Sequence, residues 1–275
     1  MATRFYLPSS GTAPSITPAF DSAWEDTSIA VRLPVTTYKK NTALTTIAFD
    51  DANAANKDVL FRQYISPPLL AQTIAAQTIK FQIRASEPDS GNNLFTVIGI
   101  RVVSNNGTSV IGTILSVTRD ATEIVLTTLT NRLFSATSSS LAVSEGDRLV
   151  IEIGLAGDPG NGKSHDGSIR IGDAAGSDLA ENDTATTDDN PWVEFATGVN
   201  MRNVDYKIIN ISDNGSTTEV NYRVYSNNGL DPLTRLTLIG TYLKSMSGSN
   251  TVAQIQTELN NNECWKYGVP ITIQR

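Results

Sequence analysis

Asp147–Leu155, DRLVIEIGL, largely alternates between apolar and polar side chains. Successive side chains of a β-strand point to opposite faces, so the pattern predicts a strand with one buried face. The two faces would carry different sets: Leu149, Ile151, Ile153 and Leu155 on one, and Arg148, Val150 and Glu152 on the other.

Similar alternation recurs along the chain, in nine further segments: Gln77–Ala85, Leu94–Ser104, Val110–Thr118, Thr122–Leu129, Ser168–Asp173, Trp192–Phe195, Tyr206–Ser212, Thr218–Ser226 and Leu233–Leu243. Many short strands at about ten-residue spacing are typical of an antiparallel β sandwich or barrel. The steps Asn106-Gly107, Asn214-Gly215 and Asn228-Gly229 each join two of these runs. Asn-Gly supplies the two positive-φ positions of a tight hairpin turn, so three hairpins are predicted.

One segment, Ser249–Asn260, has apolar residues at helical spacing behind a Ser/Asn cap. Leu69–Ala76 suits a helix or a loop equally, because two prolines precede it. A boundary near residue 200 is predicted. Residues 1–199 would form the sandwich with an extended N-terminal segment, and residues 200–275 a small β-rich unit with a helix near 250–260 and a last strand at Val269–Ile273.

The composition excludes several classes of protein. The 275 residues carry a net charge of −7 without a basic stripe, which disfavours nucleic-acid binding. Cys264 is the only cysteine, so no internal disulfide is expected and synthesis in a reducing cytosol fits. We find no apolar run long enough for a signal peptide or a membrane span, so we expect neither.

Gly157–Ser164, GDPGNGKS, matches the letters of a phosphate-binding loop. Such a loop needs a helix after it, since backbone N–H groups and the helix N-terminus hold the phosphates. The chain continues instead with HDGSIRIGD, which alternates like a strand. The segment is therefore predicted to be a long hairpin loop that turns at Asn161-Gly162 and binds no nucleotide.

Residues 157–190 contain eight acidic and two basic residues. Oxygen-rich loops on β sandwiches can hold Ca²⁺, which takes six to eight oxygen ligands. The candidate ligands are Asp158, Asp166, Asp173, Asp178, Asp183 and Asp188. The alternative is a solvated acidic loop whose Asp and Asn side chains serve turns and caps.

Other chemistry-bearing residues favour structural roles. His165 is the only histidine. Its sequence neighbours Ser164 and Asp166 do not make a triad, so an exposed loop position is expected. Glu145 with Asp147 fits a turn that enters a strand. Trp192 and Cys264 fit buried positions. Without a recognisable nucleophile–base set or cofactor loop, the chain is predicted not to be an enzyme and to need no cofactor other than the calcium considered above.

Several stretches, in order, resemble a group of tailed-phage and prophage virion structural proteins. They are MATRFYLPSSGTAPSITPAFDSAWEDTS, LFRQYISPPLLAQTI, IRVVSNNGTSVIGTILSVTRD, LTNRLFS, SEGDRLVIEIGL and GSIRIGDAAGSDLAENDTATTDDNPWVEF. The resemblance covers about residues 1–197. It implies a jelly-roll-like β sandwich in a virion, with no catalytic residues to carry over.

Two functions follow as expectations. The first is a virion structural protein, made in the host cytoplasm, acting as capsid cement or decoration or as a tail, baseplate or fibre component. Its partners would be other virion proteins and copies of itself, with no nucleic acid and no membrane. Leu7–Pro18 and Asn200–Arg275 are the candidate contact segments. The alternative is a carbohydrate-binding module or adhesin that binds host glycan with Ca²⁺ in the acidic loop.

Overall fold

The computed structural model describes residues 2–11, 13–37, 42–51, 57–89, 91–124, 128–157, 165–173, 177–184, 190–201, 203–227, 236–249, 251 and 254–255. The chain forms two compact units, Met1–Asn200 and Met201–Arg275. This division lies one residue from the boundary that the sequence predicts.

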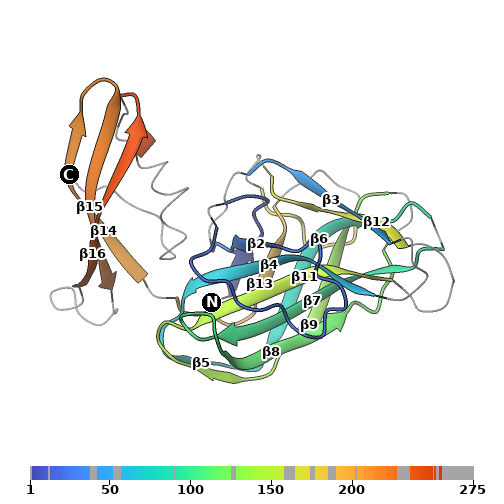
Figure 1. Ribbon diagram of the computed structural model, residues 1–275. Coiled ribbons are helices and arrows are strands. Elements are labelled where there is room, and N and C mark those ends of the chain that lie inside the picture. The colour runs from blue at the N-terminus through green and yellow to red at the C-terminus, as the bar shows by residue number, and fades with distance from the viewer. Residues whose placement is uncertain are drawn as a thin grey trace. The chain divides into compact units, whose positions relative to one another are not determined.

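The first unit contains thirteen strands among its described residues (Figure 1). They are β1 (Thr3–Tyr6), β2 (Val31–Pro34), β3 (Thr45–Asp51), β4 (Asp58–Pro68), β5 (Gln72–Ile74), β6 (Thr78–Ser86), β7 (Leu94–Val103), β8 (Val110–Arg119), β9 (Thr130–Thr137), β10 (Leu141–Val143), β11 (Arg148–Gly157), β12 (His165–Ile171) and β13 (Trp192–Phe195).

These strands form the predicted all-β sandwich. One sheet has the order β2-β4-β11-β7-β8, and the other runs β1-β13-β6-β12-β3 with β9 also paired to β6. A small sheet joins β5 to β10. The pairs are antiparallel with one exception, since β2 runs parallel to β4. The prediction of an antiparallel sandwich is confirmed, with this one parallel pair at the edge of a sheet.

Strand β11 lies in the middle of the five-stranded sheet, between β4 and β7. All ten of its residues are buried, so the second face is covered as well as the one that the alternation predicts to be buried. Glu152, on the face with the polar residues, is only 1% exposed. The N-terminal chain, dark blue in Figure 1, crosses in front of this sheet and covers that face.

The alternation of apolar and polar residues located many of the strands, but several of its predictions were wrong. Leu69–Ala76 contains strand β5 rather than a helix. Thr122–Leu129 forms no strand among its described residues; Ile124 N–H instead donates to the Leu94 carbonyl at 2.8 Å, beside β7. The alternation also missed six strands: β1, β2, β3, β4, β9 and β10.

The predicted hairpin at Asn106-Gly107 joins β7 to β8. Only Gly107, with φ of 76°, has a positive φ at this step, so the turn is longer than the predicted two-residue type. The segment after GDPGNGKS is strand β12, as expected, and no helix begins there. Because β11 and β12 belong to different sheets, they do not form the predicted hairpin. Residues 158–164 lie outside the described part.

The second unit is an antiparallel sheet of β14 (Asn203–Asp213), β15 (Thr217–Asn227) and β16 (Leu236–Ser247). Thr218 and Val220 on β15 are buried. Of the predicted helix, Gln254 and Ile255 are described and helical. Thr251 and Gln254 form a reciprocal capping box, in which Thr251 N–H donates to Gln254 Oε1 at 2.7 Å and Gln254 N–H to Thr251 Oγ1 at 3.3 Å.

The remaining predicted elements of this unit, Asn228-Gly229 and Val269–Ile273, lie outside the described residues, as do Cys264 and Trp265. Among the residues that are described, no helix has the length and apolar character needed to cross a membrane.

Candidate functional site

The candidate calcium ligands are dispersed in the structure. Asp178 and Asp183 bind arginines, while Asp166 lies in β12 and Asp173 is buried after it. In the described part of the chain, no three His, Cys, Asp or Glu side chains are grouped as a metal site requires. Asp158 and Asp188 lie outside the described residues. The four described candidates therefore do not form one calcium site.

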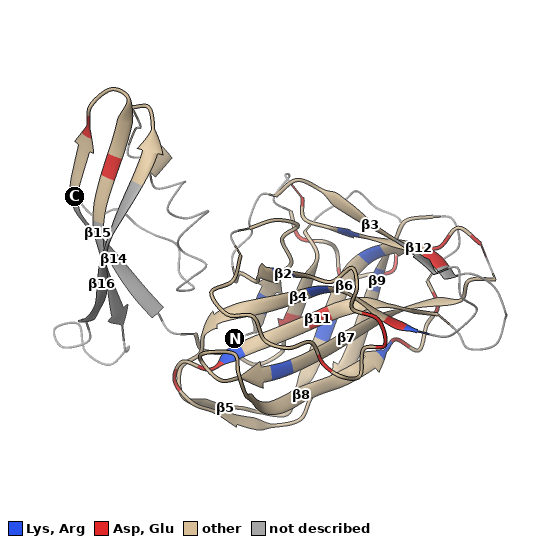
Figure 2. Ribbon diagram, viewed as in Figure 1, with Lys and Arg blue, Asp and Glu red and all other residues tan. Residues whose placement is uncertain are grey.

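The acidic residues of Ser177–Thr184 instead pair with bases of the β1-β13-β6-β12-β3 sheet. Asp178 Oδ2 lies 2.9 Å from Arg4 of β1, and Asp183 Oδ1 lies 2.9 Å from Arg132 of β9. Glu181 pairs with Lys80 of β6. Acidic and basic residues are thus interleaved in this unit (Figure 2). Three of the eight acidic residues of 157–190 thus fix the segment Ser177–Thr184 to its own sheet.

The same segment covers the free edge of β9. Asn131 N–H donates to the Thr184 carbonyl at 3.0 Å, and Leu133 N–H donates to Asp183 Oδ1 at 2.9 Å. An uncovered edge strand would present unpaired backbone groups to other chains. Asp183 therefore both neutralises Arg132 and closes this edge.

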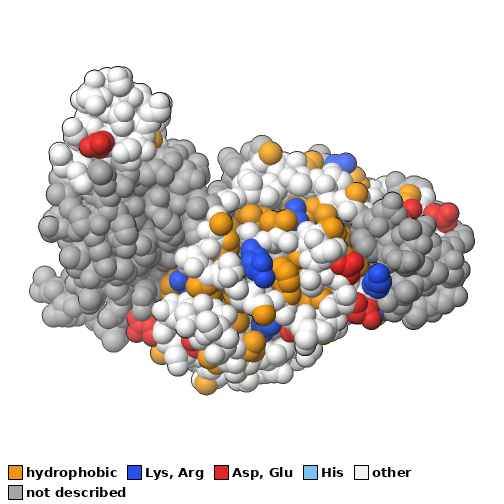
Figure 3. Space-filling model, viewed as in Figure 1, with side chains coloured by type: hydrophobic (Ala, Val, Ile, Leu, Met, Phe, Trp, Pro, Cys, Tyr) orange, Lys and Arg blue, Asp and Glu red, His pale blue; other side chains and the backbone are white. Residues whose placement is uncertain are grey.

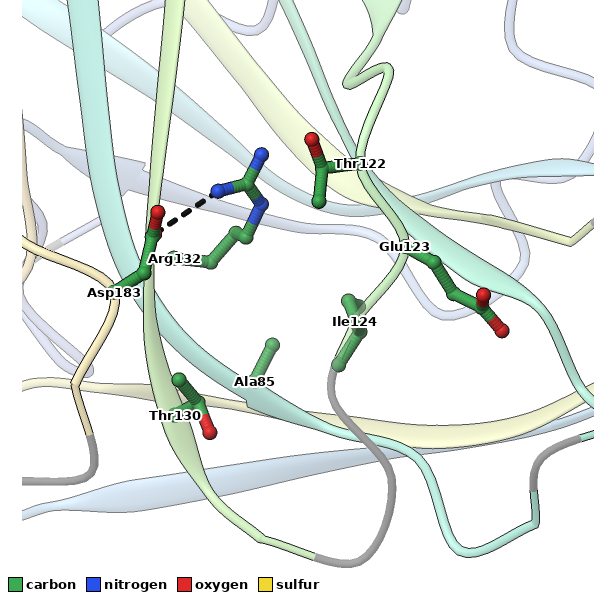
Figure 4. Close-up of a pocket in the computed structure, with 7 residues that line it drawn as sticks. All are labelled: Ala85, Thr122, Glu123, Ile124, Thr130, Arg132 and Asp183. Carbon is green, nitrogen blue, oxygen red and sulfur yellow. Dashed lines mark hydrogen bonds and ion pairs between the residues drawn. The ribbon is translucent and has the colours of Figure 1, made fainter.

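A cavity of about 70 Å³ lies next to Arg132 and is lined by residues of β6, β9, the segment after β8 and Asp183. The lining residues, shown in Figure 4, are Ala85, Thr122, Glu123, Ile124, Thr130, Arg132 and Asp183. Since a water molecule occupies about 30 Å³ in the liquid, the cavity has room for about two waters or a small polar group.

Arg132 is the charged centre of this cavity. Its Nε lies 2.7 Å from Asp120 Oδ2, and its other contact is the ion pair with Asp183. The Glu123 side chain points away from Ala85 and Ile124 (Figure 4). The seven lining residues include two hydroxyls, two carboxylates and one guanidinium, so the arrangement offers hydrogen bonding and charge.

Glu87 lies close to this region and was not singled out by the sequence. It is 1% exposed, and its Oε2 accepts the Leu94 N–H at 2.8 Å. Burial, helped by the charges of Glu123 and Asp89, raises the pKa of Glu87 to about 7 against the lowering effect of the Leu94 hydrogen bond. Nothing in the local sequence around Glu87 indicated that its side chain is buried.

We expect Glu87→Gln to alter how stability depends on pH. A raised pKa means that the folded state holds the Glu87 proton more tightly than the unfolded chain. The native protein therefore loses stability as pH rises from about 4.5 to about 7. A glutamine side chain does not ionise, so the variant should gain about 1–2 kcal/mol relative to the native protein across this interval, after allowance for solvent screening.

Thermal melts of both proteins between pH 4 and 8 measure this difference, with Glu145→Gln on an exposed turn as the control. A constant gap between Glu87→Gln and the native protein at every pH would show that Glu87 titrates normally.

A second set of buried polar groups holds the N-terminal chain on the five-stranded sheet. Glu152 accepts hydrogen bonds from Trp24 Nε1 at 2.9 Å, Gln63 Nε2 at 2.8 Å and an Arg101 nitrogen at 3.0 Å. Asp21 N–H also donates to Glu152, at 3.3 Å. A single buried carboxylate thus connects the N-terminal chain to three strands.

The predicted contact segment Leu7–Pro18 also packs on its own sandwich. Leu7 is fully buried, and Tyr64 of β4 donates its hydroxyl hydrogen bond to the Pro8 carbonyl at 3.1 Å. Ile16 packs against the cluster of Ile65, Val103 and Val150. Only the outward side of this segment is free to contact another protein.

The other residues noted in the sequence have structural surroundings. Trp192 is buried and donates to the Leu179 carbonyl at 2.8 Å. Asp147 accepts the Ser144 N–H at 2.8 Å in a turn where Gly146 has φ of 95°, as expected for a turn entering a strand. His165 is the first residue of β12. None of these residues lines the cavity.

Comparison with known proteins assigns no family. No family model matches the sequence, and no curated protein matches it. Among solved structures, the chain is similar to a CocE/NonD family hydrolase from Staphylococcus aureus, with a TM-score of 0.38 and 10% identity over 72% of this chain and 36% of the hydrolase.

Two further solved structures are similar. An aminopeptidase from a marine sediment archaeon, Thaumarchaeota archaeon, has a TM-score of 0.34 and 11% identity over 71% of this chain and 36% of its own. A structure of infectious bursal disease virus, Gx strain, has a TM-score of 0.19 and 11% identity over 90% of this chain and 52% of the viral chain. The chain spans about a third of the length of the hydrolase and of the aminopeptidase.

The prediction that the chain is not an enzyme is contradicted by the similarity to a hydrolase and an aminopeptidase, and we do not retain it. These names describe the neighbouring proteins. They assign no reaction to this chain.

Proposed function

We propose that this chain is a structural component of a tailed-phage virion that acts through protein–protein contacts, as a capsid decoration or as part of the tail, baseplate or fibre. The supporting observation is that the stretch of sequence that resembles the family ends close to where a compact structural unit ends. The resemblance covers about residues 1–197, and a compact sandwich ends at Asn200.

The quoted stretches form the framework of that sandwich. LFRQYISPPLLAQTI spans most of β4 and all of β5, and SEGDRLVIEIGL leads into β11. A resemblance carried by buried framework strands supports a shared fold more strongly than one carried by surface loops. The separate unit Met201–Arg275 is then an addition to the family-like sandwich, and we assign it to attachment.

Exposed apolar residues mark the surfaces that we assign to these contacts. Hydrophobic side chains are visible over the described surface in Figure 3. Ile29 and Val31 lie at the β2 edge of the five-stranded sheet, and Val110 and Ile111 lie on β8 at its opposite edge. Val110 is 56% exposed. Apolar groups left in water at sheet edges favour association with another protein surface.

The proposal is tested on purified particles. A phage that encodes this chain should carry it in stoichiometric amounts after density-gradient purification, measured by quantitative mass spectrometry, and a tagged copy should label one location in negative-stain images. Absence of the chain from intact particles would exclude a virion role.

Val110→Asp is expected to reduce incorporation into particles at least about tenfold, because a contact must then desolvate a carboxylate. Its effect on folding should stay within about 0.5 kcal/mol, since the side chain is mostly exposed. Ser116→Asp adds the same charge at an exposed polar position of the same strand and is the control. Equal incorporation of both variants would remove the β8 edge from the contact surface.

A further inference from the structure

The turn between β14 and β15 brings together three groups that favour a reaction of the chain with itself. Asp213, Asn214 and Gly215 are all exposed. The Gly215 N–H donates to Asp213 Oδ1 at 2.8 Å. The Asn214 side-chain carbonyl accepts the N–H groups of Ser216 at 2.9 Å and Thr217 at 2.8 Å.

The Asp213 carboxylate has the role of a base, the Gly215 nitrogen that of a nucleophile, and the N–H groups of Ser216 and Thr217 that of an oxyanion hole. Attack by a backbone nitrogen on the preceding Asn side chain requires loss of the N–H proton, which a hydrogen-bonded carboxylate assists. The same attack places negative charge on the Asn Oδ1, which two backbone N–H donors stabilise. The glycine is unhindered, because a Cβ at Gly215 would meet no atom within 4 Å.

We propose that Asn214-Gly215 is a site of spontaneous deamidation, promoted by the folded turn. The Gly215 nitrogen bonds to Asn214 Cγ and its proton passes to Asp213 or water. The Cγ–Nδ2 bond then breaks, and ammonia leaves with the proton that it needs. Water opens the resulting succinimide at either carbonyl, leaving aspartate or isoaspartate at position 214 and one additional negative charge.

Asn106-Gly107 is an internal control with the same two residues. There the Gly107 N–H donates to the Ser104 carbonyl at 2.8 Å, which is a much weaker base than a carboxylate. Gly107 is also crowded, because a Cβ there would lie 3.2–3.3 Å from Ile16 and Pro18 side-chain atoms. The fold should therefore slow the reaction at Asn106 and speed it at Asn214.

The reaction would change the hairpin that contains it. Asn214 Oδ1 caps two backbone N–H groups of the turn, and isoaspartate inserts an additional methylene into the main chain at this position. Opening of the turn would follow. The second unit would thus acquire charge with either product, and lose a cap with isoaspartate, as the protein ages, independently of its role in a particle.

The test follows both sites by peptide mass spectrometry during incubation of the full chain at pH 7.4 and 37 °C, folded and in urea. In the folded protein, conversion at Asn214 is expected to be about tenfold faster than at Asn106, equivalent to about 1.4 kcal/mol of barrier. Folding should accelerate Asn214 relative to urea and retard Asn106. Equal rates at Asn214 in folded and unfolded chains would overturn the proposal.

Asp213→Ala removes the base, and it should slow conversion at Asn214 several-fold in the folded state while leaving the rate in urea unchanged. Circular dichroism of the variant checks that the sheet is intact. If the intact variant converts Asn214 as fast as the native chain, Asp213 is not the base and the proposed mechanism fails.

Discussion

Glu152→Ala is expected to destabilise the sandwich by about 3–5 kcal/mol, among the largest single effects in the chain. The substitution removes the acceptor of three side-chain hydrogen bonds at a position that is 1% exposed. Arg101, itself 6% exposed, would lose its carboxylate partner and remain a buried charge. The melting temperature of the variant should fall by roughly 10 °C, at about 2–4 °C per kcal/mol for a domain of this size.

The measurement is thermal unfolding followed by circular dichroism and tryptophan fluorescence. Trp24 donates to Glu152, so release of the N-terminal chain should shift its emission to longer wavelength. Glu181→Ala is the matched control: it also removes a salt bridge, but the Glu181 side chain is 40% exposed, and exposed pairs contribute at most about 1 kcal/mol.

A second comparison separates the ion pair from the packing. Replacing both charges, as Glu152→Leu with Arg101→Met, should recover most of the stability that Glu152→Ala loses, because no buried charge is left unpaired. If Glu152→Ala melts like the native protein, then the carboxylate does not hold the N-terminal chain in the way that the contacts indicate.

Gly154→Ala is expected to cost about 3 kcal/mol or more, because β4 approaches β11 too closely for a side chain. A Cβ at Gly154 would lie 1.9 Å from the Val59 carbonyl oxygen and 2.9 Å from a Trp24 ring atom. The position follows a register shift between Ile153 and Gly154 in the pairing with β4. The clash is with backbone, which moves only if the sheet itself moves.

Gly99→Ala is the control, since Gly99 lies directly opposite Glu152 on β7. Its Cβ would meet a Val117 methyl at 2.9 Å, but the nearest backbone atom is 3.5 Å away, so the close contact is with a side chain and not with the sheet backbone. Both substitutions restrict the unfolded chain equally, so the difference between the stabilities of the two variants reports the contact in the native state. Equal urea midpoints for the two variants would show that β4 and β11 tolerate a side chain at Gly154.

Much of the β structure could be predicted because alternation is a local property of the main chain. DRLVIEIGL was correctly predicted as a strand, and Trp192–Phe195 has the predicted bounds. Strands such as β4 were missed, since burial on both faces removes the alternation from the sequence.

The candidate site was less predictable from local sequence. Asp178 and Asp183 were noticed for their charge, but their partners Arg4 and Arg132 lie 174 and 51 residues away along the chain. Glu87 and Glu152 gave no local sign of burial, because exposure depends on which distant segments cover a strand.

The sequence by itself determined that the chain is built of strands, where many of them run and where hairpin loops such as the one at Asn106-Gly107 occur. These depend on side-chain alternation and backbone conformation within about ten residues. Only the tertiary structure decided that Glu152 is buried and that Asp178, Glu181 and Asp183 pair with bases of their own sheet. Each depends on packing or on the exact path of the chain, which the alternation of side chains does not specify.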